Sequence, residues 1–357
     1  MISDKQHNNE LAKVVGYSFP VILTVLFLLF AFKGVDLNTS FYLIAHSSII
    51  AIFLYIIVFF ISHYVRALRW KLMLESVKKD VSSDHLFGSV MVGYGVNCVI
   101  PRLGEVYRGL FLGRWEGISR TTVIGTIVVE RIIDMFSFAF AALISVSIYS
   151  GNLYNEIVWL RASLIIGFTF IFLVTVFLIF IIRFKEKFRN KLVNLFSKFS
   201  EKYSNRLKNI IDTLIHGFAS IKGKKNAAMI IFWSVVMMLI YGINAQVGFY
   251  MLGMESTGKV SFEMAWIVMT ISSFSAMIPT PGGVGSYHAI SILVLTQLYK
   301  FDKESSAAYA ILTNFISIVA FVASTIIIIY YINHQRHKNG LSKETFLSVF
   351  KINPGEK

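Results

Sequence analysis

Residues 97–108 read NCVIPRLGEVYR and directly follow an apolar run at 86–96. They place Arg102, Glu105 and Arg108 where a helix crossing a bilayer would still lie in hydrocarbon. A charge at the centre of a membrane helix costs on the order of 3 kcal/mol, so such residues usually line a polar cavity or pair with one another. The stretch therefore predicts a polar site inside a membrane.

A helix break within the same stretch strengthens this prediction. Pro101 lacks a backbone donor and interrupts a helix, and Gly104 relaxes the turn that follows. A broken helix at membrane depth persists only where protein or water satisfies the freed backbone groups. We expect a re-entrant hairpin over 86–115, whose arms of about 15 residues are short for crossing alone. Two close-packed full spans remain an alternative.

The composition identifies an all-α polytopic membrane protein. Hydrophobic residues make up 55% of the 357, the mean hydropathy is +0.66, and several apolar runs approach the roughly 20 residues that span a bilayer. The first run lacks a cleavage site and is interpreted as a retained helix. Cys98 is the only cysteine, and no Cys/His cluster has metal-ligand spacing, so we expect no disulfide, metal or cofactor. About six full spans are predicted, at 14–32, 47–63, 121–149, 160–182, 227–252 and 305–332.

A second broken segment occurs at 265–299, where residues 278–286 read IPTPGGVGS. Two prolines and three glycines within nine residues exclude a continuous helix. Both breaks have a proline three residues before a glycine, at 101 and 104 and at 279 and 282. Paired interruptions in the two halves of a membrane protein indicate the midplane site of an inverted-repeat transporter. Two independent kinks needed only for packing are the alternative.

Basic residues set the expected orientation. The formal charge of +14 is concentrated in 65–80, 183–225 and 333–357, which the positive-inside rule places in the cytoplasm with both termini. The rule assigns Arg66, Arg69 and Lys71 to the cytoplasmic flank of the second span. The two hairpins then enter from opposite faces. We expect binding to anionic lipid headgroups rather than to nucleic acid.

These charges also divide the chain. The N-terminal membrane half is 1–182, the linker is 183–225, the C-terminal membrane half is 226–332, and the tail is 333–357. The linker holds twelve Lys or Arg against three acidic residues and has apolar positions at helical spacing. It predicts a basic amphipathic helix on the cytoplasmic surface. A solvated helical linker is the alternative.

The third span carries charges within its apolar sequence. Glu130 and Asp134 are four residues apart on one helix face, and Arg131 is three residues from Asp134. With Arg102, Glu105 and Arg108, these charges sum to zero. They are expected either to exchange partners with a lipid headgroup or to form a purely structural salt-bridge network.

Other polar side chains carry weaker predictions. His288 is either a proton relay or simply hydrogen-bonded. Asn244, Gln246 and Asn314 are expected to form interhelical hydrogen bonds. No Walker loop, nucleophile elbow or HExxH motif occurs, so we expect a protein that is not an enzyme. An intramembrane enzyme acting on a lipid phosphate or polyprenyl-linked sugar, and a membrane partner of a lipid synthase, remain alternatives.

Four motifs in series carry a family resemblance. They are RALRW at 66–70, the stretch at 97–108, VVERIID at 128–134 and PTPGGVGS at 279–286. The chain resembles the lysylphosphatidylglycerol synthase transmembrane-region family of flippase-like proteins and is similar to the membrane flippase part of the multiple peptide resistance factor. The resemblance implies movement of a phospholipid or polyprenyl-phosphate-linked lipid between the leaflets of the bacterial cytoplasmic membrane.

The resemblance also implies which residues line the headgroup path. The multiple peptide resistance factor adds a soluble aminoacyl transferase after its membrane part, whereas only residues 333–357 follow the last predicted span here. Lysine transfer by this chain is therefore not expected. A homodimer is kept open as an oligomeric state. The implied path residues are Asn97, Arg102, Glu105, Arg108, Glu130, Arg131, Asp134, Pro279, Thr280, Pro281, Gly282, Gly283 and Gly285.

Overall fold

A computed structural model of the chain describes residues 18–75, 77–151, 153–183 and 223–350. These residues form helices and connecting segments, and no strand occurs among them, so the expected all-α fold is confirmed for this part of the chain. The predicted basic segment at 183–225 lies outside the described residues except for its first residue and its last three. Its amphipathic character stays a prediction.

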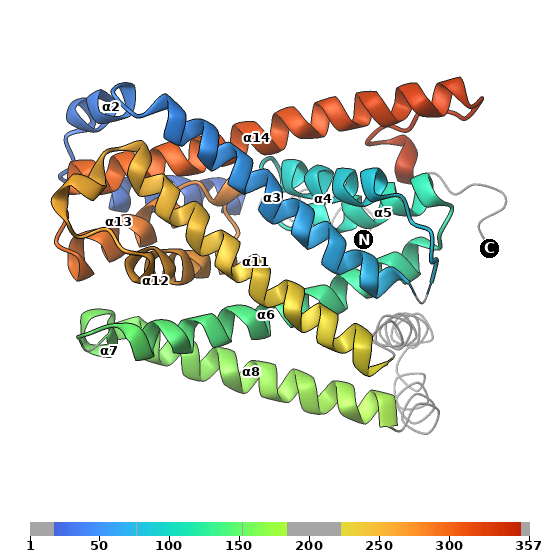
Figure 1. The fold of residues 1–357 in the computed structure, drawn as a ribbon, viewed down its shortest axis with the longest axis horizontal. Helices are drawn as coiled ribbons and strands as arrows, with labels where there is room; N and C mark the ends of the chain where they lie inside the picture. The colour runs from blue at the N-terminus through green and yellow to red at the C-terminus, as the bar shows by residue number, and fades with distance from the viewer. Residues whose placement is uncertain (1–17, 76, 152, 184–222, 351–357) are drawn as a thin grey trace, which may run out of the picture. The chain divides into compact units, whose positions relative to one another are not determined.

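The helices follow one another in the order of Figure 1. An apolar helix at Ser18–Ala31 comes first. The α-helices after it are α2 (Leu37–Ala45), α3 (Ile49–Leu74), α4 (Ser83–Asn97), α5 (Gly104–Glu116), α6 (Arg120–Ile148), α7 (Leu153–Glu156), α8 (Val158–Arg183), α11 (Lys224–Met251), α12 (Phe262–Ser272), α13 (Ser286–Leu298) and α14 (Lys303–Lys338). Short 3₁₀ helices are η1 (Met254–Thr257), η2 (Ser273–Met277), η3 (Pro281–Gly283) and η4 (Ser348–Phe350).

Three of these helices are long and apolar enough to cross a membrane: α3, most of α11, and α14. Shorter apolar helices occur at Ser18–Ala31, Val158–Phe170 and Phe262–Met277. The 29-residue α6 matches the length of the predicted third span but carries four formal charges. The described residues thus support a membrane protein with several spans, while the count of six stays a prediction.

The chain divides into two compact units, each of which draws on both predicted halves. Unit 1 comprises Met1–Phe60, Tyr94–Gly104 and Ile240–Ile326. Unit 2 comprises Ile61–Gly93, Glu105–Leu239 and Ile327–Lys357.

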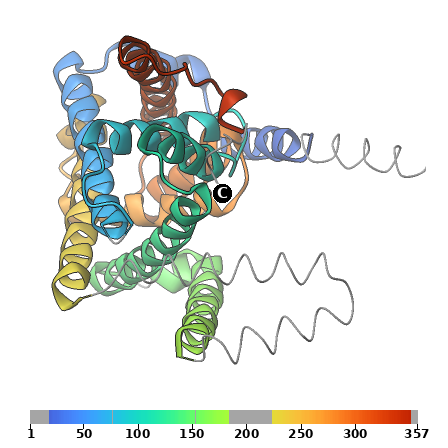
Figure 2. The same ribbon diagram turned by 90° about the vertical axis from the view of Figure 1, so that its right-hand side faces the viewer.

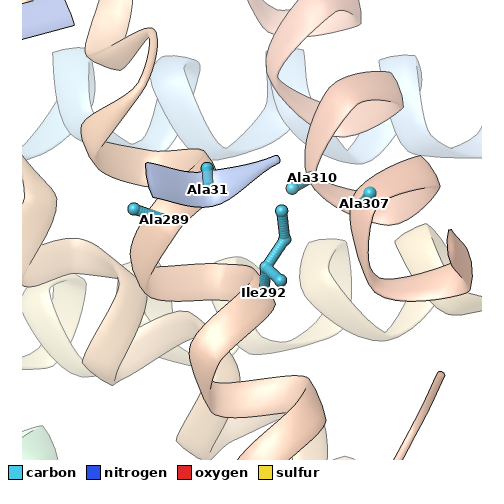
Figure 3. Packing of buried hydrophobic residues seen from close by; sticks show 5 residues of the cluster. All are labelled: Ala31, Ala289, Ile292, Ala307 and Ala310. Carbon is cyan, nitrogen blue, oxygen red and sulfur yellow. The ribbon is translucent and has the colours of Figure 1, made fainter. Parts of the chain in front are cut away.

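Small side chains allow close helix packing in unit 1. Ala31, Ala289, Ala307 and Ala310 surround Ile292 in a buried cluster, as Figure 3 shows. Small residues let membrane helices approach closely enough for extensive van der Waals contact. The cluster joins the first helix to α13 and α14.

Both predicted helix breaks are present. α4 ends at Asn97 and α5 begins at Gly104, so the break around Pro101 is confirmed. The second break lies between α12 and α13, where η2 and η3 replace α-helix around Pro279. α12 and α13 contact each other and lie side by side in Figure 1. Each break therefore joins two short helical arms, and whether these arms are re-entrant in a membrane stays a prediction.

A helical hairpin forms part of unit 2. α6 and α8 contact each other and are connected through the short α7, so they run antiparallel, as Figures 1 and 2 show. Glu130 and Asp134, both on α6, are buried, as are Arg66 and Arg69 on α3. This pattern departs from the usual one, in which buried residues are apolar.

Glu116 connects the end of α5 to the loop before α4 and to His85 near the start of α4. Its carboxylate accepts from Lys78 Nζ at 2.5 Å, from the Ser82 N–H at 3.1 Å and contacts His85 Nδ1 at 2.6 Å. Burial raises the pKa of this carboxyl, but the hydrogen bonds from His85 and Lys78 outweigh burial and lower the pKa to about 2. The charged carboxylate is therefore the form that the folded state prefers.

This cluster predicts an acid-sensitive contribution to stability. Because the folded pKa of Glu116 lies below its ordinary value of 4.5, its contribution is present above about pH 4.5 and is lost as the pH falls toward about 2. As the pH is lowered through this window, the melting temperature in detergent should fall less steeply for Glu116→Gln than for the wild type. Glu156→Gln, at an exposed position, should follow the wild type. Parallel curves for Glu116→Gln and the wild type would contradict the prediction.

Candidate functional site

The two carboxylates of α6 face two arginines of α3 in unit 2. Arg66 Nε lies 2.9 Å from Glu130 Oε1, and Arg66 also pairs with Asp134. Arg69 Nη2 lies 3.2 Å from Glu130 Oε1 and 2.5 Å from Asp134 Oδ1. Side chains three or four positions apart lie on one helix face, which explains why each helix presents both of its charges to the other.

A third arginine reaches the same carboxylate from α5. Arg108 Nη1 lies 2.7 Å from Glu130 Oε2, and its guanidinium stacks 3.7 Å from the centre of the Trp70 ring. Trp70 Nε1 donates to Thr126 Oγ1 at 3.0 Å, which fixes the ring. The face of the aromatic ring attracts the positive charge of the guanidinium, and the N–H groups in the guanidinium plane stay available to bind carboxylate oxygens.

We call Arg66, Arg69, Arg108, Glu130 and Asp134 the ion-pair network. All five are buried, and the side chains of Arg69 and Glu130 have no exposed area. Charges taken out of water are retained only when good geometry and hydrogen bonds compensate the lost hydration. Here each carboxylate contacts at least two guanidinium groups, and Arg69 also donates to Ser234 Oγ at 3.1 Å.

Glu105 and Arg131 form an outer pair beside the network. Arg131 Nε lies 3.6 Å from Glu105 Oε1, and Arg131 Nη1 lies 3.6 Å from Asp134 Oδ2. Their side chains are 31% and 37% exposed, whereas those of the network are at most 7% exposed. The outer pair is thus the part of the cluster that a ligand can reach with the least rearrangement.

The first break is held by side chains of unit 1. Asn97 Oδ1 accepts from the Gly104 N–H at 2.8 Å, which satisfies a free donor at the start of α5. Arg102 lies in the left-handed region, with φ of 65°. Its guanidinium donates to the Met277 carbonyl at 2.8 Å. Since Met277 ends η2, the two broken segments meet at this hydrogen bond.

The second break depends on three glycines with positive φ. Gly282, Gly283 and Gly285 have φ of 58°, 72° and 86°. Asn314 Nδ2 donates to the Gly282 carbonyl at 2.9 Å, and the Thr280 and Ser286 hydroxyls lie 2.7 Å apart. Asn314 of α14 therefore satisfies a backbone carbonyl in the turn, and the two hydroxyls bind each other across it.

The structure groups the predicted path residues in two sets. Unit 2 brings together Glu105, Arg108, Glu130, Arg131 and Asp134. Unit 1 brings together Asn97, Arg102 and the turn at 279–285. Arg102 contributes to the break contact in unit 1, so the prediction that it joins the other five charges is not what the contacts show.

Sequence reasoning missed two members of the network. Arg66 and Arg69 were assigned to the cytoplasmic flank of the second span, which stays a prediction, and they were not expected in the network. α3 continues to Leu74, and both side chains are buried. A signal was available: two arginines three residues apart match two carboxylates four residues apart. The positive-inside rule counts charges in loops and does not register a charge that is paired inside a helix bundle.

Other predicted polar residues have local roles. His288 Nδ1 accepts from the Gly285 N–H at 3.2 Å, and its ring packs edge-on against Phe32. Gln246 donates to the Tyr250 hydroxyl at 3.2 Å within α11. Among the described residues, no group of three or more His, Cys, Asp and Glu side chains could hold a metal ion.

Arg102 carries a prediction about backbone strain. The left-handed region costs about 1–2 kcal/mol for a residue with a Cβ atom. Arg102→Ala and Arg102→Gly both remove the hydrogen bond to Met277, but only glycine relieves the strain. We expect Arg102→Gly to be more stable than Arg102→Ala by about 1 kcal/mol, after the entropic cost of glycine in the unfolded chain. Denaturant titration in detergent measures the difference, and an equally stable alanine variant would refute it.

Comparison with known proteins identifies the family of the chain. The family model for the lysylphosphatidylglycerol synthase TM region matches residues 17–324, which includes both breaks and the whole network. The chain belongs to this family. No solved structure matches the chain.

Two archaeal relatives of this family member are similar over much of their length. A UPF0104 membrane protein from Methanocaldococcus jannaschii is 23% identical over 319 residues, covering 86% of this chain and 92% of the relative. A UPF0104 membrane protein from Methanothermobacter thermautotrophicus is 24% identical over 252 residues, covering 68% of this chain and 73% of the relative.

Proposed function

We propose that this family member is a lipid translocator that moves a phospholipid or a polyprenyl-phosphate-linked lipid between the leaflets of the cytoplasmic membrane, with both termini in the cytoplasm. The observation that carries the proposal is the contact between the two broken segments, where Arg102 donates to the Met277 carbonyl. Broken helices at membrane depth form the substrate sites of many transporters because their freed backbone groups and charged neighbours can bind polar cargo.

The charged cluster supplies the second part of the proposal. In it, the outer pair receives the headgroup while the lipid tails stay in hydrocarbon. Arg131 offers a planar donor group that suits phosphate oxygens, and Glu105 can release Arg131 to them. The ion-pair network behind holds α3, α5 and α6 in register, since breaking a buried charge pair is strongly unfavourable.

Transport is favoured over chemistry by the state of the carboxylates. A general base must be free to reach the proton that it abstracts. Glu130 and Asp134 each contact arginine side chains, and neither is exposed enough to meet a substrate directly. We therefore propose that the protein is not an enzyme, which lipid mass spectrometry after incubation with the purified chain would test through the absence of new products.

A liposome assay tests the transport function directly. Purified protein is reconstituted with phosphatidylglycerol that carries a headgroup fluorophore, and a membrane-impermeant quencher reports the lipid that has changed leaflet. Liposomes that contain the wild-type protein should move more labelled lipid between leaflets than empty liposomes do. Arg131→Gln should slow movement about tenfold, equivalent to about 1.4 kcal/mol, because the headgroup loses its first cationic contact.

A second arginine serves as the control, because it distinguishes loss of the headgroup site from loss of a positive charge on the surface. Arg161 on α8 is exposed, and Arg161→Gln removes the same charge without touching the cluster. It should move lipid at the wild-type rate. Equal rates for the two variants would exclude the outer pair as the headgroup site, and a wild type no faster than empty liposomes for phospholipid and polyprenyl-phosphate probes would refute transport.

A further inference from the structure

The chain after α14 returns to α5, the helix that carries Glu105 and Arg108. It turns at Gly340, which has φ of 72°, and continues to Phe350. Figure 1 shows this reversal. We propose that residues 341–350 form a strap that fixes the position of α5 and thereby holds Arg108 against Glu130 and Glu105 beside Arg131 for the headgroup. The inference rests on the proposed function only for that last step.

The strap is first anchored to the end of α14 by hydrogen bonds between side chains of α14 and the backbone of the strap. Asn333 Nδ2 donates to the Glu344 carbonyl at 2.7 Å, and Asn333 Oδ1 accepts from the Glu344 N–H at 2.8 Å. Arg336 Nε donates to the Ser342 carbonyl at 3.0 Å. A side-chain amide that binds both backbone groups of one residue acts as a paired strand would. These hydrogen bonds therefore fix the backbone path of the segment.

A buried carboxylate then links the strap to α5. Glu344 is 3% exposed, and its Oε1 lies 3.3 Å from Arg336 Nη2 and 3.8 Å from Arg114 Nε. Arg114, in the last turn of α5, also donates through Nη2 to the Ser348 carbonyl at 3.2 Å. The Ser348 hydroxyl donates to Glu344 Oε2 at 2.7 Å. The two polar contacts from Arg114 hold the C-terminal end of α5.

Aromatic packing holds the middle of α5. The ring centres of Phe346 and Phe350 lie 5.6 and 5.3 Å from that of Tyr107, and Phe346 lies 5.7 Å from Phe111. Aromatic pairs at such distances add favourable ring contacts to the apolar area that they bury. Val349, between these contacts, is completely buried. The strap thus contacts the residue directly before Arg108.

The geometry of α5 explains why such a strap is needed. α5 has 13 residues, and the break at 98–103 separates it from α4. An isolated helix of this length is marginal in water, and its order depends on tertiary packing. A short helix that follows a helix break can shift as a unit, and such a shift would move Arg108 relative to Glu130. The contacts of the strap oppose this shift from the side of α5 where Tyr107 and Phe111 lie.

Hydrogen–deuterium exchange of the full chain in lipid nanodiscs tests the strap without reference to transport. Phe346→Ala/Phe350→Ala removes the aromatic contacts, and Leu347→Ala changes a neighbouring side chain that is 81% exposed. We expect amides of α5 to exchange at least about tenfold faster in the first variant, an opening free energy lower by about 1.4 kcal/mol, and at the wild-type rate in Leu347→Ala. Unchanged exchange in α5 would overturn the proposal.

The liposome assay tests the positioning role. Phe346→Ala/Phe350→Ala should lower the rate of lipid movement about tenfold. Phe346→Leu, which retains Phe350 and an apolar side chain at position 346, should keep most of the wild-type rate. Faster exchange in α5 with an unchanged rate would overturn the positioning role. If the wild type moves no lipid, faster exchange in α5 still supports the strap, and the transport function alone fails.

A charge exchange provides a second test of the strap that does not depend on the folding of the aromatic variant. Glu344→Arg places a third positive charge beside Arg114 and Arg336, and Arg114→Glu in the same chain restores an opposite pair. The double variant should restore slow exchange in α5 relative to Glu344→Arg alone. Failure of the second change to restore protection, in chains that stay monodisperse in detergent, would overturn the link through Glu344.

Discussion

Glu130→Ala is expected to lower the free energy of unfolding by about 3–5 kcal/mol, because it removes the carboxylate that contacts Arg66, Arg69 and Arg108. Three guanidinium groups would then lie in a buried space with Asp134 as the one carboxylate of the network left. Water cannot hydrate them there without opening the helices. Chemical unfolding in detergent, followed by circular dichroism, measures the loss.

Glu105→Ala is the matched control for this prediction. It removes a carboxylate from the same cluster, but one whose side chain is 31% exposed and 3.6 Å from its arginine. Exposed and partly exposed ion pairs contribute about 0–1 kcal/mol. Equal losses for the two variants would show that burial does not distinguish the network from the outer pair.

A second change in the network separates charge from shape. Arg108→Met in the Glu130→Ala background removes one of the stranded guanidinium groups. The double variant should be more stable than Glu130→Ala alone, because replacing both members of a buried ion pair by apolar groups costs less than breaking the pair. A double variant that is less stable would show that Arg108 contributes mainly through its packing on Trp70.

Gly285→Ala is expected to destabilise unit 1 strongly, with a loss of about 2–5 kcal/mol. A Cβ atom at this position would lie 2.7 Å from the Thr24 carbonyl oxygen in the first helix. Backbone cannot move aside as a flexible side chain can, so overpacking of about 1–3 kcal/mol adds to the strain of φ at 86°. Thermal unfolding in detergent reports the change.

Gly283→Ala isolates the strain from the overpacking. Its φ of 72° is similarly left-handed, but the nearest atoms to an added Cβ lie 3.7 and 3.8 Å away, which is ordinary contact. We expect a loss of about 1–2 kcal/mol, from strain alone. If Gly283→Ala were as damaging as Gly285→Ala, the close approach of the first helix would not be the reason for Gly285.

Much of the local architecture was predictable. Pro101 and the glycines after Pro279 break their helices where the sequence indicated, because a missing N–H and a positive φ act within one turn. The shared face of Glu130 and Asp134 was also predictable, since it follows from helix geometry alone. Arg131 meets Asp134 for the same reason.

The partners of these charges were less predictable. Arg66 and Arg69 occupy the end of an apolar run, and a rule based on loop charge assigns them to water. Their burial follows from the length of α3 and from carboxylates more than sixty positions away. The strap at 341–350 was likewise interpreted as part of a basic tail, because no local pattern connects Glu344 with Arg114.

Neighbouring residues were enough to specify a helical membrane protein with two interrupted segments and with charges placed at helical spacing. The packed fold was needed to show that α3 supplies the arginines for α6, that Arg102 binds the carbonyl of Met277, and that the chain returns to hold α5. The difference lies in the range over which each effect acts. Backbone geometry acts over a few residues, whereas the desolvation that makes a buried charge costly depends on every helix packed around it.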